Sequence, residues 1–291
     1  AARRDRLDLF HGTVNVLPKR LSARTVVTIH DLALLRWPEQ TPARRHRYLS
    51  RAIPAAVKRA DRVIAVSEAT KADVVDLLGV DPAKVAVTHL GVEDRFKPAS
   101  SKRIKAVREV YAIDGPFVLY VGTLEPRKSL PNLLRAFARI QHEIPHSLAL
   151  AGAEGWKARE FREAVEEVNL GDRLRLLGFV DERDLPALYS AADLFAFPSL
   201  YEGFGLPVLE SMACGTPVVT SNLSSLPEVG GEAALLVEPA DIDGIGQAII
   251  AGLTDKELRG RLISAGKKRA ARFTWQATAK ATATAYREAL R

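Results

Sequence analysis

The most informative stretch of this sequence is Pro198-Ser-Leu-Tyr-Glu-Gly-Phe-Gly-Leu-Pro-Val-Leu-Glu210. Two glutamates, Glu202 and Glu210, lie eight positions apart and flank a Gly-x-Gly turn that opens a predicted helix. Glu210 lies about one turn into that helix, so both carboxylates can face one ligand. The backbone N–H groups of Gly203, Phe204 and Gly205 lie where the helix begins, and a helix N-terminus favours phosphate or sugar oxygens. The stretch therefore predicts a site for a polar, phosphate-bearing ligand.

Short apolar runs alternate with helical patterns along the whole chain, which is typical of a parallel α/β architecture. The first ninety residues contain four predicted strands, at 7–10, 26–30, 63–66 and 85–89, with helices at about 42–60 and 68–78. Six further strands are predicted at 117–121, 148–151, 174–177, 194–197, 218–220 and 234–237, with helices at 130–143, 159–169 and 206–214. Three helices end the chain, at 242–253, 256–272 and 275–290. The second set completes a doubly wound sheet, whereas the first gives only part of one.

The polar segment 93–101, which contains Pro98, predicts an interdomain linker. We therefore expect a first domain over 1–97, a second over 98–273, and a C-terminal helix over 274–291 that packs back on the first domain. Ligands of open parallel sheets bind beyond the carboxyl ends of the strands. Glycines, acidic and basic residues and a histidine follow the predicted strands at these ends. This clustering predicts a cleft for a polar ligand.

Composition narrows the class of protein. The only cysteine among the 291 residues is Cys214, which excludes an internal disulfide or a cysteine-rich metal site and favours a reducing, cytoplasmic setting. No stretch approaches the roughly 18 apolar residues of a spanning helix. The net charge of +7 is concentrated in residues 1–60, which carry 13 Lys/Arg against 4 Asp/Glu, while the remainder carries 29 against 31.

Several segments together carry a resemblance to a known family. The stretch 198–210 resembles the Glu-x7-Glu motif of retaining glycosyltransferases of family four, which have the GT-B fold of two Rossmann-like domains. Val121-Gly-Thr-Leu-Glu-Pro-Arg-Lys128 is similar to the phosphate-binding strand exit of that family, and Cys214-Gly-Thr-Pro-Val-Val219 follows the glutamate helix as it usually does. In the N-terminal part, Thr28-Ile-His-Asp31, Ala65-Val-Ser-Glu68 and His89-Leu-Gly-Val92 match the family's pattern. The resemblance covers nearly the whole chain and implies a GT-B type α/β fold with two parallel sheets, the first incomplete.

The resemblance also implies catalytic roles. Lys128, with Arg127 beside it, would neutralise the donor diphosphate as the leaving group departs, because fixed cations aimed at developing charge lower the barrier. Glu202 would hold hydroxyls of the transferred sugar. His30 would line the cleft from the other domain and contact the sugar or the reaction centre.

Binding roles follow in the same way. Glu210 would accept hydrogen bonds from the ribose, and the amides of residues 203–205 would face the donor. Gly122 and Thr123 would line the diphosphate; the family often has an arginine in place of Thr123, and Arg127 is the obvious substitute. The base pocket is expected near Gly178, Phe179 and Val180.

The function implied by the resemblance is a retaining hexosyltransferase that moves a sugar from a nucleoside diphosphate to a hydroxyl acceptor. Sequences similar to bacterial mannosyltransferases share the form of residues 122–128, which favours mannose and the donor GDP-mannose, with a UDP-sugar as the alternative. No cofactor or catalytic metal is expected: Asp241-Ile-Asp243 spells an Asp-x-Asp pattern, but Asp241 stands where an N-cap is predicted. The acceptor stays open, a lipid-linked one included.

Other functions stay open at this point. A non-catalytic or weakly active nucleotide-sugar-binding fragment would fit the incomplete first domain, and a nucleotide-sugar epimerase can share the fold. A phosphorylase can share it too, but should carry a lysine in a motif for pyridoxal phosphate, and the sequence shows no such motif. Nucleic-acid binding is not expected, since the basic residues lack an aromatic-interleaved pattern or a known motif.

The predicted helix 42–60 raises a separate expectation. Its residues Arg44, Arg47, Arg51 and Lys58 could meet an anionic membrane or a lipid-phosphate acceptor as a peripheral contact. Core packing explains its apolar face equally well, and Pro54 is expected to interrupt the helix.

The short first domain raises the last expectation. The strand before His30 is reached within thirty residues, and residues 1–6 contain no predicted strand. A four-stranded sheet leaves an unpaired edge that is prone to association. We expect a fragment, a naturally shortened form, or a first domain completed by self-association or by a second chain.

Overall fold

The structure is a computed structural model that describes residues 7–155 and 157–291. The chain forms two compact units. The first contains the chain up to Gly91, together with Glu202–Phe204 and Phe273–Arg291, and the second contains Val92–Tyr201 and Gly205–Arg272. The expectation about residues 1–6 lies outside the described residues.

The first unit is built around a parallel sheet with the order β1-β2-β3-β4 in the described part of the chain. Its strands are β1 (Leu9–Gly12), β2 (Arg24–Ile29), β3 (Arg62–Ala65) and β4 (Val85–Val87). Its helices are α1 (Ala33–Arg36), α2 (Ala43–Arg59), α3 (Glu68–Leu78) and α12 (Trp275–Ala289), and short 3-10 turns lie at Pro38–Gln40 and Pro82–Lys84.

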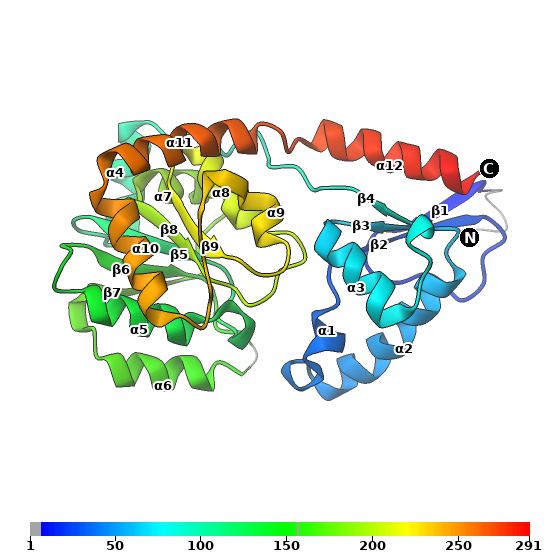
Figure 1. The fold of residues 1–291 in the computed structure, drawn as a ribbon, viewed down its shortest axis with the longest axis horizontal. Helices are drawn as coiled ribbons and strands as arrows, with labels where there is room; N and C mark the ends of the chain where they lie inside the picture. Colours follow the sequence, from blue (N-terminus) through cyan, green and yellow to red (C-terminus); the bar gives the residue numbers. More distant parts are fainter. Residues whose placement is uncertain (1–6, 156) are drawn as a thin grey trace. The chain divides into compact units, whose positions relative to one another are not determined.

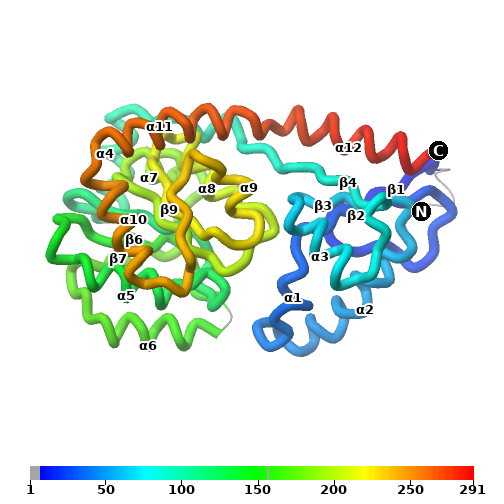
Figure 2. The backbone as a smooth tube through the Cα atoms, in the orientation of Figure 1, coloured from blue at the N-terminus to red at the C-terminus, as the bar shows by residue number. Residues whose placement is uncertain are grey.

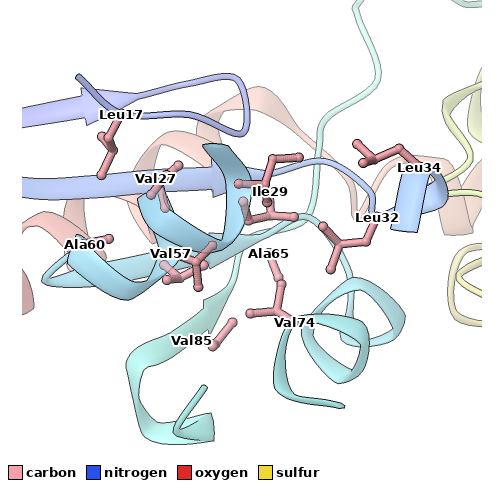
Figure 3. Packing of buried hydrophobic residues seen from close by; sticks show 13 residues of the cluster. Leu17, Val27, Ile29, Leu32, Leu34, Val57, Ala60, Ala65, Val74 and Val85 are labelled. Carbon is pink, nitrogen blue, oxygen red and sulfur yellow. The ribbon is translucent and has the colours of Figure 1, made fainter. Parts of the chain in front are cut away.

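Both faces of this sheet are covered, because alternate residues of a strand point to opposite faces. Val27 and Ile29 of β2 lie in the cluster that contains buried residues of α2 and α3 (Figure 3). Val26 and Ile64 lie in a second cluster with Ala285 and Ala289 of α12, so the C-terminal helix packs on the opposite face of the same sheet (Figure 1).

Helix α2 runs unbroken through Pro54, so the expected interruption is wrong. Proline removes one hydrogen bond from a helix interior. The helix is retained because Ile53, Ala56 and Val57, on either side of the proline, are fully buried against the sheet.

Helix α3 begins and ends where local signals predict. The hydroxyl of Ser67 accepts a hydrogen bond from the Thr70 N–H, which satisfies one of the free donors of the first turn. Gly79 ends the helix in the left-handed conformation, with φ of 62°, which glycine adopts without strain.

The second unit is also an α/β unit. Its strands are β5 (Phe117–Val121), β6 (Ser147–Ala151), β7 (Leu174–Gly178), β8 (Leu194–Phe197), β9 (Val218–Ser221) and β10 (Leu235–Val237). Its helices are α4 (Ser101–Val110), α5 (Leu130–Ile140), α6 (Arg159–Val168), α7 (Leu185–Ala191), α8 (Leu206–Cys214), α9 (Leu226–Gly230), α10 (Ile242–Thr254) and α11 (Lys256–Ala270). Short 3-10 turns lie at Pro126–Lys128, Gly171–Arg173 and Gly231–Ala233.

The strand order of the second sheet, β10-β9-β8-β5-β6-β7, creates a topological switch point. From β5 the chain proceeds outward through β6 and β7, then returns to the other side of β5 as β8 and proceeds outward again through β9 and β10 (Figure 1; Figure 2 draws the same path as a tube). All of these pairings are parallel. The connections therefore diverge above the carboxyl ends of β5 and β8, which is where doubly wound sheets bind ligands.

The predicted pair of parallel sheets, the first smaller than the second, is confirmed. Buried aromatic rings from β5 and β8 pack on one another in the second unit. The Phe197 ring stacks on Tyr120 and on Phe195 at centroid distances of 5.7 Å each. Helices α4 and α7 were not predicted, because both are short and follow polar or proline-containing segments.

The packing of α2 can be tested by truncating Ile53, which is fully buried beneath the first sheet. Replacing it with alanine removes apolar contacts and leaves a cavity. We expect Ile53→Ala to lower the free energy of unfolding by about 2–5 kcal/mol, measured by urea denaturation. Leu77→Ala on the exposed side of α3 is the control, with an expected loss below about 1 kcal/mol. Equal losses in the two variants would contradict the assigned packing.

Candidate active site

The carboxyl ends of β5 and β8 are tied together within the second unit. The N–H of Leu200, just after β8, donates to the carbonyl of Arg127, just after β5, at 2.8 Å. Segments 122–128 and 198–201 therefore adjoin at the switch point of the sheet. Both segments contain residues that the sequence analysis singled out.

Glycines let the backbone of neighbouring strand exits approach closely. Gly122 and Gly152 follow β5 and β6 with φ of 152° and 153°, which side chains rarely tolerate. A Cβ on Gly152 would lie 2.0 Å from the Gly122 carbonyl oxygen, so no larger residue fits there. The Gly122 N–H donates to Ala151, and the Gly152 N–H donates to Gly178 at the end of β7. The exits of three adjacent strands thus form one continuous backbone surface.

Lys128 is fixed at this surface. It ends the 3-10 turn Pro126–Lys128, its side chain is only 6% exposed, and its Nζ lies 5.2 Å from the centroid of the Phe197 ring. An ammonium group over an aromatic face is stabilised by the electrons of the ring. The next residue, Ser129, has φ of 54° and begins α5, which turns the chain sharply after the lysine.

Arg127 is held by neighbouring groups of the same unit. Its Nε lies 2.6 Å from a Glu125 carboxylate oxygen, and its Nη1 donates to the Tyr201 carbonyl at 3.0 Å. The Arg127 side chain therefore links the segment after β5 to the segment after β8. Sequence reasoning did not identify Glu125 as the partner, because an acid two residues away gives no signal of its own. The neighbouring Thr123 accepts a hydrogen bond at its carbonyl from the Tyr120 hydroxyl, at 3.2 Å.

Glu210 lies on α8, which begins after Gly205 in a left-handed conformation with φ of 116°. The hydroxyl of Tyr189 donates to the Glu210 carboxylate at 2.9 Å. Burial raises the pKa of Glu210 to about 7, although this hydrogen bond acts in the opposite direction. Tyr189 was missed from the sequence, since it lies in the short helix α7 and resembles an ordinary core aromatic.

Gly178 ends the edge strand β7, and Phe179 and Val180 follow it. Phe179 is 78% exposed, whereas Val180 is buried. The exposed ring offers an apolar face at the end of the backbone surface, which a planar heterocycle could contact.

His30 follows β2 in the first unit and is held by the loop between β1 and β2. Its N–H donates to the Asn15 side chain at 2.9 Å, and its Nε2 lies 2.8 Å from the Thr13 carbonyl. Because a carbonyl oxygen only accepts, Nε2 carries the proton and Nδ1 is left as an acceptor.

Glu202, Gly203 and Phe204 cluster with the first unit rather than with the residues that flank them in sequence. The Gly203 carbonyl accepts hydrogen bonds from the hydroxyls of Ser67 at 2.6 Å and Thr70 at 3.0 Å. A Cβ on Gly203 would lie 1.8 Å from the His30 carbonyl oxygen, so only glycine fits. Glu202 is 9% exposed beside this contact.

Phe204 anchors the same loop through its side chain. The ring stacks on His89 at 5.9 Å and meets Phe273 edge to face at 5.8 Å. The backbone amides of Gly203 and Phe204 thus belong to a loop packed in the first unit, and Gly205 alone caps α8.

The predicted site residues fall into two groups. The second unit brings together Gly122, Thr123, Arg127 and Lys128 at the switch point and carries Gly205, Glu210, Phe179 and Val180 on the neighbouring elements. The first unit brings His30 together with the loop Glu202–Phe204. Ser67 and Thr70, which hold this loop, were not predicted to contact it: Ser67 lies in the family-like segment Ala65–Glu68, and Thr70 lies in the predicted helix 68–78.

Asp241 is an N-cap, as predicted, because its carboxylate accepts from the Gly244 N–H at 2.9 Å. Within residues 7–155 and 157–291, no three His, Cys, Asp or Glu side chains group as ligands for a metal ion. No helix in the same residues has the length and apolar character needed to cross a bilayer.

Comparisons with known proteins place these features in a family context. Residues 104–269 match the family model described as "Glycosyl transferases group 1", and residues 1–96 match "Glycosyltransferase Family 4". The chain is 36% identical to the O-antigen chain mannosyltransferase B of Escherichia coli over 98% of its own length and 76% of that protein. It is 32% identical to a serotype-specific mannosyltransferase WbdA of the same species, of which it spans only 34%.

A solved structure supports the fold. Sucrose-phosphate synthase from Thermosynechococcus elongatus superposes with a TM-score of 0.79 at 28% identity, over 97% of this chain and 73% of that one. The GT-B type fold expected from the sequence is thereby confirmed.

The close approach at Gly203 predicts a sharp steric effect. Gly203→Ala places a methyl group against the His30 carbonyl, and we expect a loss of about 1–3 kcal/mol in the free energy of unfolding. Gly260→Ala is the matched control, because Gly260 lies inside α11 with nothing near its added methyl. Alanine there should raise stability by up to about 1 kcal/mol. A Gly203→Ala protein as stable as the unmodified chain would contradict the described contact.

The raised pKa of Glu210 predicts a pH-dependent stability. The folded chain favours the neutral Glu210 carboxyl. The contribution of this carboxyl to the free energy of unfolding is therefore fully present below its ordinary pKa of 4.5 and is lost as pH rises through about 7. Between pH 5 and 8 this loss amounts to about 2 kcal/mol. The side chain in Glu210→Gln cannot ionise, so this variant should lack the pH-dependent loss of stability. Glu109→Gln, an exposed change on α4, should show the same pH profile as the unmodified protein. Parallel profiles for all three proteins in denaturant titrations would contradict this assignment.

Proposed function

The chain belongs to the group 1 glycosyltransferases of family 4, and on that premise we propose that it is a retaining mannosyltransferase. The donor is a nucleoside diphosphate mannose and the acceptor carries a hydroxyl group. Donor binding is assigned to the second unit and acceptor binding to the first.

The observation that carries the proposal is the buried Lys128 at the switch point of the second sheet. A cation held by burial and by the Phe197 ring needs little reorganisation when negative charge develops beside it. As the glycosidic bond breaks, charge accumulates on the leaving diphosphate, and Lys128 would stabilise it. The backbone at Gly122 and Thr123, which carries no bulky side chain, would let the phosphates approach closely, with the charge of Arg127 beside that of Lys128.

The nucleoside would extend from the same surface. Glu210, ionised at higher pH, is suited to accept hydrogen bonds from the two ribose hydroxyls. The exposed ring of Phe179, with the buried Val180 beside it, would lie against the base.

The transferred sugar would be held by groups of the first unit. Glu202 would bind sugar hydroxyls, and the Nδ1 atom of His30 would accept a hydrogen bond from the sugar or the acceptor. Acceptor attack would occur on the face that the phosphate leaves, and a leaving phosphate oxygen would take the acceptor proton. This course needs no carboxylate nucleophile and no metal ion, and it retains the anomeric configuration.

Mannose is favoured by the relatives. Two of the similar proteins are named as mannosyltransferases, one of them 36% identical. GDP-mannose is the donor we propose, with a UDP-sugar as the alternative, because a base read mainly through backbone and apolar contacts leaves little trace in the sequence.

The proposal is tested with the protein and a panel of GDP-, UDP- and ADP-sugars. We expect GDP-mannose to raise the melting temperature most, and slow release of mannose without acceptor, with the α-configuration at first when followed by proton NMR. Binding without any turnover would favour a nucleotide-sugar-binding module, and a changed sugar still attached to the nucleotide would favour an epimerase. Free β-mannose as the first product would overturn the retaining course.

Replacing Lys128 tests the group on which the proposal rests. We expect Lys128→Gln to lower the rate of donor cleavage by about 10²–10³-fold, the range found when one preorganised charge-stabilising donor is lost. Lys105→Gln, on the exposed face of α4, removes the same charge and should leave the rate unchanged. Circular dichroism of both variants separates a folding defect from a catalytic one, and a folded Lys128→Gln protein of full activity would contradict the assigned role.

A further inference from the structure

Helix α2 carries two stripes of side chains, and only one of them faces the core. The buried stripe contains Ile53, Ala56 and Val57. The other stripe contains Arg44, Arg47, Tyr48, Arg51 and Ala55, whose spacing of three or four residues places them along one side of a helix. The helix contains six Lys/Arg residues and no acidic residue.

The second stripe lines a pocket of about 700 Å³ in the first unit. Leu17 and Lys19, from the loop between β1 and β2, form its other side, and Arg59 at the end of α2 completes it. Arg59 is positioned by hydrogen bonds from its Nη2 to the carbonyls of Leu17 and Pro18, at 3.2 and 3.3 Å. The pocket therefore combines five cationic side chains with apolar walls.

Three of these cations are uncompensated. Within the described residues, the guanidinium groups of Arg44, Arg47 and Arg51 make no hydrogen bond or ion pair. Arg36, by contrast, which also belongs to the basic end of the chain, is paired with Asp73. Like charges gathered without counter-charges repel one another, so an anionic partner would relieve this repulsion.

We propose that this pocket docks the first unit on an anionic phospholipid surface, with a lipid phosphate among the arginines. Tyr48 is 64% exposed among these arginines, and tyrosine is favoured at the boundary between lipid headgroups and acyl chains. The apolar walls of the pocket suit the glycerol and upper acyl region below the phosphate. Charge and apolar surface on one helical stripe are the combination that binds at the membrane interface without spanning the bilayer.

Vesicle sedimentation tests the proposal directly. The whole chain is mixed with phosphatidylcholine vesicles that contain 30–40% phosphatidylglycerol, roughly the anionic fraction at which surface attraction is strong. We expect the protein to sediment with these vesicles at low salt, to be released as salt is raised, and to stay in solution with pure phosphatidylcholine. No sedimentation with the anionic vesicles would overturn the proposal.

A pair of charge-matched variants locates the surface. Arg44→Gln/Arg47→Gln/Arg51→Gln should lower partitioning by roughly 100-fold, because each basic residue near an anionic surface contributes about fivefold. Lys256→Gln/Arg261→Gln/Lys268→Gln removes the same charge from exposed positions of α11 and should change partitioning much less. All six positions are exposed, so both variants should fold, which melting curves would verify. Equal losses would mean that net charge alone drives binding, and would overturn the assignment to this pocket.

A soluble phosphate compound is the competing occupant. Inorganic pyrophosphate is titrated against the unmodified protein and the α2 variant, and melting temperature and vesicle binding are followed together. Because the proposed nucleotide site would also bind phosphate, only a shift that the α2 variant lacks is informative. We expect no such shift below millimolar pyrophosphate. A shift that depends on the three arginines, in a protein that ignores vesicles, would assign the pocket to a soluble anion instead.

Discussion

The pairing of β5 with β8 is the constraint on which the second unit depends. These strands are neighbours in the sheet although β6, β7 and three helices separate them in sequence, and the chain therefore leaves their carboxyl ends in opposite directions. The bond from the Leu200 amide to the Arg127 carbonyl extends that pairing beyond the sheet. It fixes the turn that carries Lys128 over the Phe197 ring, so one backbone contact positions the cation on which the proposed chemistry rests.

In the first unit the corresponding role falls to the contact between Gly203 and the His30 carbonyl. The absence of a side chain at Gly203 lets the loop lie against the end of β2, and the hydroxyls of Ser67 and Thr70 hold its carbonyl there. Phe204 then fills an aromatic cluster with His89 and Phe273. Three short sequence motifs, at 28–31, 65–68 and 89–92, each weak alone, all contact this one loop, which explains why they occur together with it.

Much of this architecture could be predicted because the signals are local. Strands buried on both faces appear as apolar runs, and caps such as Ser67 and Asp241 lie next to the helices they begin. The pairs that tune the site could not be predicted, since they depend on packing between elements. Tyr189 reaches Glu210 only because α7 packs on α8, and Arg127 meets Glu125 only because the 3-10 turn folds the chain back. Strand β1, an edge strand with a weak apolar signal, was placed two residues too early for the same reason.

The central claim is that a nucleoside diphosphate binds at the carboxyl ends of β5 and β8. A crystal structure of the chain with GDP tests it most directly. The account predicts the diphosphate within hydrogen-bond distance of the Lys128 ammonium and over the backbone of Gly122 and Thr123, with the ribose hydroxyls on the Glu210 carboxylate. A nucleotide bound at another edge of the sheet, or a diphosphate that makes no contact with Lys128, would contradict it.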